Sequence, residues 1–358
     1  LATKAEVREA VENAKAALKS SNWGGVRPRE RTKALQAWTD LIEAEAETLA
    51  KIEALSSTRP VSQLVLGDIA VTAEQIRFFA EFADKEGSDV VPTDDQTFGM
   101  TISEPYGVVG AITPWNFPIS MAGWKLGPAL AAGNAVVIKP SEMTPFSTVY
   151  MAQLAIKAGI PAGLVNVVLG DGLTTGNALT GHADIAKVSF TGSTRAGSAI
   201  MENIARTGVK PMTLELGGKS PQIVFADADL DAALPAVVNA IVQNAGQTCS
   251  AGSRVLIDAL IYERVLERLA SMFEALRVGP AAMDLDLGPL IRQSQQQRVW
   301  DFLSDAQVAG IPVMAQGTVV DGAPQTGFYQ APTLLRDVPP DHRLAQEEIF
   351  GPVLSAMP

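Results

Sequence analysis

The cysteine at position 249 is the residue best suited to covalent chemistry in this chain of 358 residues. It lies in the small-residue segment GQTCSAG, residues 246–252, after an apolar stretch with helical spacing. Glycine has no side chain, so a substrate and the backbone can approach the sulfur closely. An ionised thiol attacks a carbonyl carbon, and the backbone N–H of the cysteine can donate to the oxyanion that forms. A buried apolar role is the alternative, because lone cysteines are commonly core residues.

Asn116 and Glu215 have the side chains that the other steps of such a reaction need. Asn116 lies between two prolines in PWNFP, residues 114–118, and its amide can donate to an oxyanion. Glu215 stands in the apolar segment LELGG, residues 214–218. We expect a strand there, in which a buried carboxylate holds a proton readily and acts as a general base. The alternatives are a turn-forming asparagine and an ion pair on an edge strand.

Two further segments have features of nucleotide binding. KPSE, residues 139–142, offers Lys139 and Glu142 to donate to and accept from ribose hydroxyls, whereas a helix capped by Ser141 is the alternative. FTGSTRAG, residues 190–197, predicts a strand, a turn and a helix start, and the N–H groups of a helix N-terminus suit a pyrophosphate. The glycines of this segment do not match the G-x-G-x-x-G fingerprint, so the motif is weak by itself.

Two more segments resemble ligand-binding turns. The run GKS at residues 218–220 resembles the end of a phosphate-binding P-loop, but that motif needs a glycine where Thr213 stands, so we exclude it. EEIFGPV, residues 347–353, contains Glu348 and Phe350. A carboxylate and an aromatic ring at a glycine turn can hold a ribose and pack against a nicotinamide ring. The alternative is an exposed acidic helix end followed by a strand.

The elements that must position these residues change character along the chain. Residues 1–86 indicate helices: residues 3–6 form a capping box, and a second helix has apolar residues three and four apart over residues 35–52. Residues 87–105 are polar and β-prone, which predicts an extended arm or hairpin. From Tyr106 onward strands and helices alternate, as in a parallel sheet covered on both faces. We expect strands at Val108–Ile112, Ala135–Ile138, Val165–Leu169, Ala186–Phe190, Gln222–Phe225 and Arg254–Ile257.

Composition limits the partners of the chain. The 28 basic and 39 acidic residues give a net charge of -11, which disfavours nucleic acid and anionic membrane surfaces. One cysteine allows no disulfide within the chain and fits a reducing cytoplasm. His182 and His342 have no metal-ligand spacing, so we expect no metal site. The apolar region 108–138 is interrupted by prolines and a lysine, so it predicts a buried core and not a membrane span.

The order of the motifs resembles that of the aldehyde dehydrogenase superfamily over essentially the whole chain. The motifs follow one another as PWNFP, KPSE, FTGST, LELGGKSP, GQTCSAG and EEIFGPV. The resemblance implies an α/β fold with a Rossmann-like parallel-sheet cofactor domain, a second α/β catalytic domain and a small β arm. The cofactor domain would consist of residues 1–86 and 106–217, and the catalytic domain of residues 218–358. The β arm would be residues 87–105 and would serve oligomerisation. The resemblance also implies that this chain lacks the family's C-terminal portion.

The resemblance implies a role for each motif residue. Cys249 would be the nucleophile, and its N–H and the Asn116 amide would form the oxyanion hole. Glu215 would activate water for thioester hydrolysis, and Lys125 looks like the family's proton-relay lysine. Relatives that transfer the acyl group to coenzyme A lack this glutamate, so its presence implies hydrolysis to the acid. The substrate tunnel would include Met121 and Trp124, and the cofactor site would include Trp115, Lys139, Ser141, Glu142, Gly192, Ser193, Leu216, Glu348 and Phe350.

The implied reaction is NAD(P)-dependent oxidation of an aldehyde to a carboxylic acid. We expect NAD, with NADP as an alternative, because Glu142 would hydrogen-bond a 2′-hydroxyl and repel a 2′-phosphate. The expected partners are a small aldehyde and further copies of the chain in a homodimer or homotetramer, and the expected location is the cytoplasm. Two competing interpretations are a catalytically silent scaffold and a thiol hydrolase that acts on esters without nicotinamide.

Overall fold

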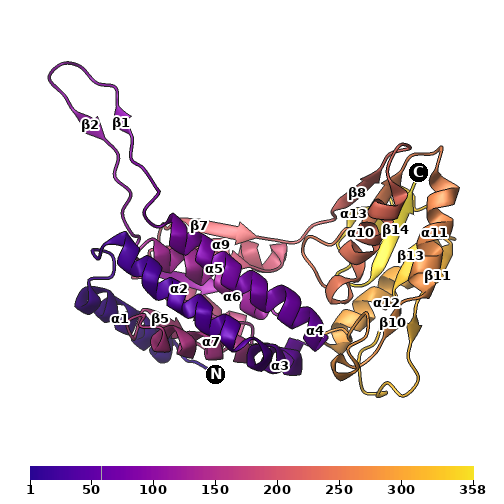
Figure 1. Ribbon diagram of the computed structural model, residues 1–358, viewed down its shortest axis with the longest axis horizontal. Coiled ribbons are helices and arrows are strands. Elements are labelled where there is room, and N and C mark those ends of the chain that lie inside the picture. The colour runs from indigo at the N-terminus through magenta and orange to yellow at the C-terminus, as the bar shows by residue number, and fades with distance from the viewer. Residues whose placement is uncertain (58) are drawn as a thin grey trace. The chain divides into compact units, whose positions relative to one another are not determined.

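The computed structural model describes residues 1–57 and 59–358, which form two compact units (Figure 1). Each unit contains one five-stranded sheet and the helices that pack on it. The first unit is made of Leu1–Ser56 and Val65–Glu215, and the second of Ser57–Leu64 and Leu216–Pro358. No helix among the described residues is both long and apolar enough to span a bilayer.

The sheet of the first unit is parallel throughout. Its strands are β3 Val108–Ile112, β4 Ala135–Lys139, β5 Val165–Val167, β6 Lys187–Thr191 and β7 Met212–Glu215. The order across the sheet is β5-β4-β3-β6-β7. Every residue of β3 and β4 is buried, because helices cover both faces, and these strands therefore read as unbroken apolar runs in the sequence. The predicted strands in this region are confirmed, with ends that differ by one or two residues.

Helices pack around this sheet and against one another. They are α1 Lys4–Ser21, α2 Pro28–Ala44, α3 Ala46–Ser57, α5 Ala70–Phe82, α6 Pro118–Ala131, α7 Phe146–Lys157, α8 Asn177–Thr180 and α9 Thr194–Thr207. Helices α1, α6 and α7 contact the strands, and α2 packs on α5, α6 and α7. The predicted capping box is confirmed, since the Thr3 N–H donates to Glu6 Oε2 at 2.7 Å and the Glu6 N–H donates to Thr3 Oγ1 at 3.4 Å.

The expectation of one helix over residues 35–52 is wrong. Helix α2 ends at Ala44, and α3 begins at Ala46. Between them the Glu45 N–H donates to the carbonyls of Leu41 and Glu43, a tightened turn that ends the first helix. The apolar spacing continues across the break because the buried faces of both helices contribute to the same unit, and spacing alone cannot reveal the interruption.

A hairpin occupies the segment between α5 and β3. Its strands are β1 Val90–Val91 and β2 Gly99–Met100, which pair antiparallel with Val90 opposite Met100. Figure 1 shows the hairpin projecting away from the helices of its unit. Nearly every side chain in it is exposed, so local turn chemistry and not core packing forms the hairpin.

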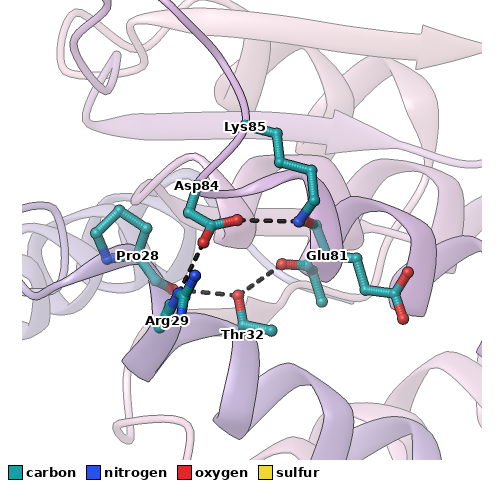
Figure 2. A network of polar contacts seen from close by, with 7 residues as sticks. Pro28, Arg29, Thr32, Glu81, Asp84 and Lys85 are labelled. Atoms are coloured by element: carbon teal, nitrogen blue, oxygen red, sulfur yellow. Dashed lines mark hydrogen bonds and ion pairs between the residues drawn. The ribbon is translucent and has the colours of Figure 1, made fainter.

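A polar network joins the first turn of α2 to the end of α5, where the hairpin segment begins (Figure 2). The Thr32 hydroxyl donates to the Ala80 carbonyl at 2.6 Å. The Asp84 carboxylate lies 2.9 Å from Arg29 Nε and 3.0 Å from Lys85 Nζ. The hydrogen bonds from Arg29 and Lys85 lower the pKa of Asp84. These contacts hold the base of the hairpin segment to the helices.

Residues 57–64 belong to the second unit, whereas the sequence analysis assigned them to the cofactor domain. This segment contains the short helix α4, Val61–Gln63. The Ser62 N–H and hydroxyl donate to Asp284 Oδ1 at 3.1 and 2.9 Å, and the Gln63 amide donates to the Asp286 carbonyl at 3.1 Å. Contacts between residues more than 200 positions apart decide this grouping, and no local pattern predicts them.

The second unit has a mixed sheet in the order β11-β13-β14-β9-β8. The strands are β8 Pro221–Val224, β9 Arg254–Ile257, β11 Val313–Gln316, β13 Thr333–Leu335 and β14 Val353–Met357, and a separate short pair is β10 Arg277–Val278 with β12 Thr318–Val319. All neighbours in the main sheet are parallel except β11 and β13. The helices are α10 Leu230–Val242, α11 Tyr262–Glu274, α12 Gln293–Val308 and α13 Arg343–Gln346. Their fully buried side chains, among them Phe273 and Phe302, form the core with the strands.

Candidate active site

Polar residues of the first unit gather at the carboxyl ends of four neighbouring strands. Lys139 ends β4 and pairs with Ile112 at the end of β3. Glu215 ends β7 and pairs with Thr191 at the end of β6. The turns that contain Asn116 and Gly192 follow β3 and β6. Because the carboxyl edge of an open parallel sheet is where such folds bind ligands, this edge is the candidate site of the unit.

Asn116 lies in a firmly held turn between β3 and α6. Its side chain is buried, at 5% exposure. On one side the Thr113 N–H donates to the Lys139 carbonyl at 3.1 Å, and on the other Pro118 occupies the first turn of α6. The Thr144 hydroxyl also donates to the carbonyl of Trp115 at 3.4 Å. The backbone that carries Asn116 is therefore restrained before any ligand binds.

Lys125 is a buried cation in the middle of α6. Its side chain is 5% exposed, and Nζ donates to the Ser189 hydroxyl of β6 at 3.0 Å. Burial lowers the pKa of Lys125 to about 8, and the negative charge of Glu215 acts against that shift. Met121 and Trp124 lie four residues and one residue earlier on the helix, and Trp124 is 46% exposed. Their place in a substrate tunnel stays a prediction.

The expectation that Glu215 is buried is wrong. Glu215 is exposed at the end of β7, which is the edge strand of its sheet. Burial alternates along β7, with Thr213 and Glu215 on the exposed face. The prediction of a buried carboxylate rested on the apolar neighbours Leu214 and Leu216, which are half-buried. The Glu215 carbonyl accepts the Gly192 N–H at 3.0 Å, so its backbone is nevertheless held next to the turn after β6.

Lys139 and Glu142 lie together after β4. Lys139 Nζ donates to the carbonyls of Pro140 and Gly170 at 2.9 and 2.8 Å and lies 3.5 Å from Glu142 Oε2. Burial lowers the pKa of Lys139, and the Glu142 charge opposes this. The alternative of a helix capped by Ser141 is wrong, because α7 begins at Phe146.

Ser193 is the N-cap of α9 and is separated from the end of β6 by Gly192, so the predicted strand, turn and helix start are confirmed. Its hydroxyl accepts the Ala196 N–H at 3.2 Å, and the side chains of this first turn are exposed. Nearby strand ends carry the buried hydroxyls of Thr113 and Thr191, for which the described part of the chain offers no hydrogen-bond partner. A helix N-terminus beside unsatisfied buried hydroxyls suits a polar, anionic ligand.

In the second unit, the Gly217–Gly218 backbone lies close to the carboxylate of Glu348, and Gly218 also lies close to the backbone of Cys249. Cys249 is half-buried in the loop between α10 and β9, and a Cβ built on Gly218 would lie 3.9 Å from its carbonyl oxygen. The Gly218 N–H donates to Glu348 Oε1 at 3.3 Å. A Cβ on Gly217 would lie 2.3 Å from Glu348 Oε2, so only glycine allows the carboxylate to lie over this backbone.

The loop after Glu348 is strained and held by α12. Phe350 has a φ of 62°, in the left-handed region that costs a residue with a side chain about 1–3 kcal/mol. Gln295 donates to its carbonyl at 2.8 Å, and Arg298 donates to the carbonyls of Glu348 and Ile349. Burial raises the pKa of Glu348, opposed chiefly by the Gly218 N–H. The contacts from α12 hold the backbone of this loop, and the Gly218 N–H contacts the carboxylate itself.

Lys219 is a feature that the sequence did not predict. Its Nζ is buried without a hydrogen-bond partner among the described residues. Burial and then the charge of Arg254 lower the pKa of Lys219 to about 7, while the Glu348 charge opposes them. The charges that act on Lys219 belong to Arg254 of β9 and to Glu348, which lie far away in sequence. No local sequence pattern therefore predicts its environment. No group of three or more His, Cys, Asp or Glu in residues 1–57 and 59–358 is placed to hold a metal ion.

Replacing Lys125 by methionine should stabilise the protein below pH 8. The folded-state pKa is lowered from 10.5 to about 8, so the unfolded chain binds more protons between these values and stability rises with pH there. The penalty for the charged amine is therefore full below pH 8 and disappears toward pH 10.5, a change of about 3 kcal/mol. The stability advantage of Lys125→Met, measured from Tm, should shrink over that range. An advantage independent of pH, or one shared by the exposed control Lys4→Met, would contradict this.

Comparison with known proteins identifies the family. The model of the aldehyde dehydrogenase family matches residues 1–358. An aldehyde dehydrogenase of Aspergillus niger is 43% identical over 355 residues, which are 99% of this chain and 70% of that protein. The NAD+ complex of an aldehyde dehydrogenase from Bacillus cereus superposes with a TM-score of 0.94 at 40% identity, covering 100% of this chain and 72% of that one. The indole-3-acetaldehyde dehydrogenase of P. syringae has a TM-score of 0.95 at 39% identity, with coverage of 99% and 72%. This chain belongs to the aldehyde dehydrogenase family.

Proposed function

We propose that this protein oxidises an aldehyde to a carboxylic acid with NAD, with Cys249 as the nucleophile and Glu215 as the hydrolytic base. Oxidation of aldehydes to acids is the reaction of the family. One observation carries the assignment of the nucleophile: Cys249 is half-buried in a glycine-flanked loop whose backbone lies next to Gly218, the glycine whose N–H donates to Glu348. A structural cysteine would gain nothing from that position, whereas a nucleophile needs an approach free of side chains.

The first step forms a thiohemiacetal. The thiolate of Cys249 attacks the aldehyde carbon, and the carbonyl oxygen takes up the negative charge. The Asn116 amide and the Cys249 N–H are the donors that we assign to this oxyanion. A donor that is held in place before the reaction costs no reorganisation, and such a donor is typically worth about 100- to 1000-fold in rate. The restrained turn around Asn116 supports this role.

The residues present fit a dinucleotide. The exposed start of α9 at Ser193 can bind the pyrophosphate, and Lys139 with Glu142 can bind the adenosine ribose. Glu348, over the glycine backbone, can accept from the hydroxyls of the second ribose, with Phe350 beside it. When bound, NAD supplies the acceptor for the hydride that leaves the aldehyde carbon. The further members of this proposed site are Trp115, Ser141, Gly192 and Leu216.

Hydrolysis of the thioester is assigned to Glu215. The exposure of this carboxylate supports the role, because a general base must reach the water that it deprotonates. The ammonium of Lys125, whose pKa is influenced by Glu215, supplies a nearby positive charge and a proton-exchanging group. The Ser189 hydroxyl holds that amine in place at 3.0 Å.

NAD is favoured over NADP by Glu142. The carboxylate can accept from a 2′-hydroxyl, whereas a 2′-phosphate would bring like charges together. We also propose that the chain works in the cytoplasm as a homodimer or homotetramer, with the 87–105 arm in the subunit contact. The exposed apolar side chains of Val90, Phe98 and Met100 on this arm support that contact. Sedimentation velocity measures the assembly directly, and a monomer at micromolar concentration would remove that part of the proposal.

Turnover of a full-length Asn116→Ala variant tests the proposed chemistry. Wild-type protein should form NADH from a panel of aldehydes, and the variant should lower kcat by about 100-fold or more because one oxyanion donor is lost. The KM for NAD should stay within a few-fold. A wild-type protein that forms no NADH would favour the silent scaffold, and ester hydrolysis without nicotinamide would favour the hydrolase. Near-normal turnover in a folded Asn116→Ala variant would remove Asn116 from the oxyanion hole.

A further inference from the structure

The carboxamide of Gln247 is buried two residues before Cys249, at 1% exposure. Gln247 Oε1 accepts the Ile291 N–H at 2.9 Å, and Gln247 Nε2 donates to the Asn244 carbonyl at 3.1 Å. In return, Asn244 Nδ2 donates to the Gln247 carbonyl at 3.3 Å. Two amide side chains thus close the loop on itself and tie it to a segment 44 residues away.

The backbone inside this closed loop is strained. Asn244 and Ala245 have φ values of 49° and 51°, and Gly246 follows at 72°. Glycine adopts the left-handed region freely, and asparagine tolerates it, but alanine loses about 1–2 kcal/mol there. Such a conformation persists only where its surroundings hold it. The backbone N–H of Gln247 closes this turn by donating to the Asn244 carbonyl at 3.0 Å, and the side chain of Gln247 adds the bonds that tie the turn to Ile291.

Ile291 gives the loop a support that it shares with the cofactor-binding loop. Ile291 lies two residues before α12, and Gln295 in the first turn of α12 donates to the Phe350 carbonyl. The two loops also touch directly, since a Cβ on Gly246 would lie 2.2 Å from the carbonyl carbon of Gly351. A shift of the turn at residues 244–246 would therefore press Gly246 against Gly351 and would move the backbone that leads to Cys249.

We propose that Gln247 is a positioning residue for catalysis, which holds the Cys249 thiol in its reactive place by clamping the left-handed turn 244–246 to Ile291. The inference rests on the proposed role of Cys249 as the nucleophile. Gln247 acts through the backbone and does not touch the substrate. Removal of the clamp lets Ala245 relax toward a right-handed conformation and displaces the sulfur. Displacements of about 1 Å at a reacting atom cost on the order of 100-fold in rate.

The test uses the full-length enzyme with Gln247→Met, which keeps the length of the side chain and removes its hydrogen bonds. We expect kcat to fall about 10- to 100-fold while the KM for NAD changes less than about threefold. Peptide mass spectrometry measures the rate at which iodoacetamide alkylates Cys249 between pH 6 and pH 9. In Gln247→Met this rate should be lower than in the wild type, and its dependence on pH should differ. The matched control is Gln330→Met, another buried glutamine of the same unit, at 7% exposure, which should leave both rates within twofold.

A rescue variant separates positioning from mere packing. Ala245→Gly removes the cost of the left-handed turn, so adding it to Gln247→Met should restore the alkylation rate and kcat by several-fold. Wild-type rates in folded Gln247→Met, losses equal to those of Gln330→Met, or no rescue would each overturn the proposal. If Gln247→Met does not fold, Gln247→Asn takes its place, because its amide is one methylene shorter and cannot reach both Ile291 and Asn244. Unchanged rates in that variant would likewise overturn the proposal.

Alkylation needs no aldehyde or NAD, so these outcomes remain readable if the proposed function fails. A wild-type enzyme without aldehyde-dependent NADH formation refutes the function, while a change in Cys249 alkylation still reports on the clamp.

Discussion

A full-length Cys249→Ala variant is expected to fold, bind NAD and form no NADH from any aldehyde. The loss should be on the order of 10⁴-fold or more in kcat, because no other thiol in the chain can form the covalent intermediate. The oxyanion donors remain, but without a nucleophile there is no oxyanion for them to bind. Absorbance at 340 nm follows the reaction, and titration of intrinsic fluorescence follows NAD binding.

Ser250→Ala is the matched control for that experiment. It removes one heteroatom from the adjacent residue of the same loop and should keep turnover within about threefold. Substantial NADH formation by Cys249→Ala would show that the hydride leaves a hydrated aldehyde without a thioester, and the assignment of the nucleophile would be wrong. Equal loss in Ser250→Ala would mean that the loop is sensitive to any change.

The parts of the fold that the sequence predicts are those governed by local pattern. β3 coincides with its predicted bounds because an unbroken apolar run suits a strand that is buried within a sheet. β9 also has its predicted bounds, although its burial alternates. The capping box at residues 3–6 could also be predicted from the sequence, since it depends on two side chains three residues apart. The strand, turn and helix start at residues 190–197 follow from the same kind of local chemistry.

The parts that the sequence does not predict depend on distant partners. Glu215 is exposed because β7 is the edge strand, and strand order is set by pairings between remote segments. Residues 57–64 join the second unit through Asp284 and Asp286. The buried amine of Lys219 and the clamp of Gln247 arise in the same way. Their chemistry is visible only once the loops that surround them are placed.

The exposure of Glu215 sharpens its proposed role. A carboxylate buried in a strand would be shielded from the water that it must deprotonate. The carboxylate of Glu215 is exposed at the end of a strand and is therefore in contact with water. Such a base acts in the hydrolytic step, which needs water, and has no part in thiohemiacetal formation or hydride departure. The two halves of the reaction can therefore be separated by mutation.

A full-length Glu215→Gln variant should accordingly release a burst of about one NADH per subunit and then stall. Acylation of Cys249 does not need the base, whereas water attack on the thioester does, and general-base catalysis typically contributes about 100- to 10,000-fold. Stopped-flow absorbance at 340 nm gives the burst and the later steady rate, and intact-protein mass spectrometry should detect the acyl adduct on Cys249.

The control for this variant is Glu104→Gln, an exposed glutamate in the segment before β3, which should show wild-type turnover. The glutamine in Glu215→Gln also removes the negative charge that raises the pKa of Lys125, so that amine should lose its proton more readily in the variant. A wild-type steady rate in Glu215→Gln would assign the base to another group. Loss of the burst together with the steady rate would instead place Glu215 in the acylation step, where its charge would act on Lys125 or on the thiol and not on water.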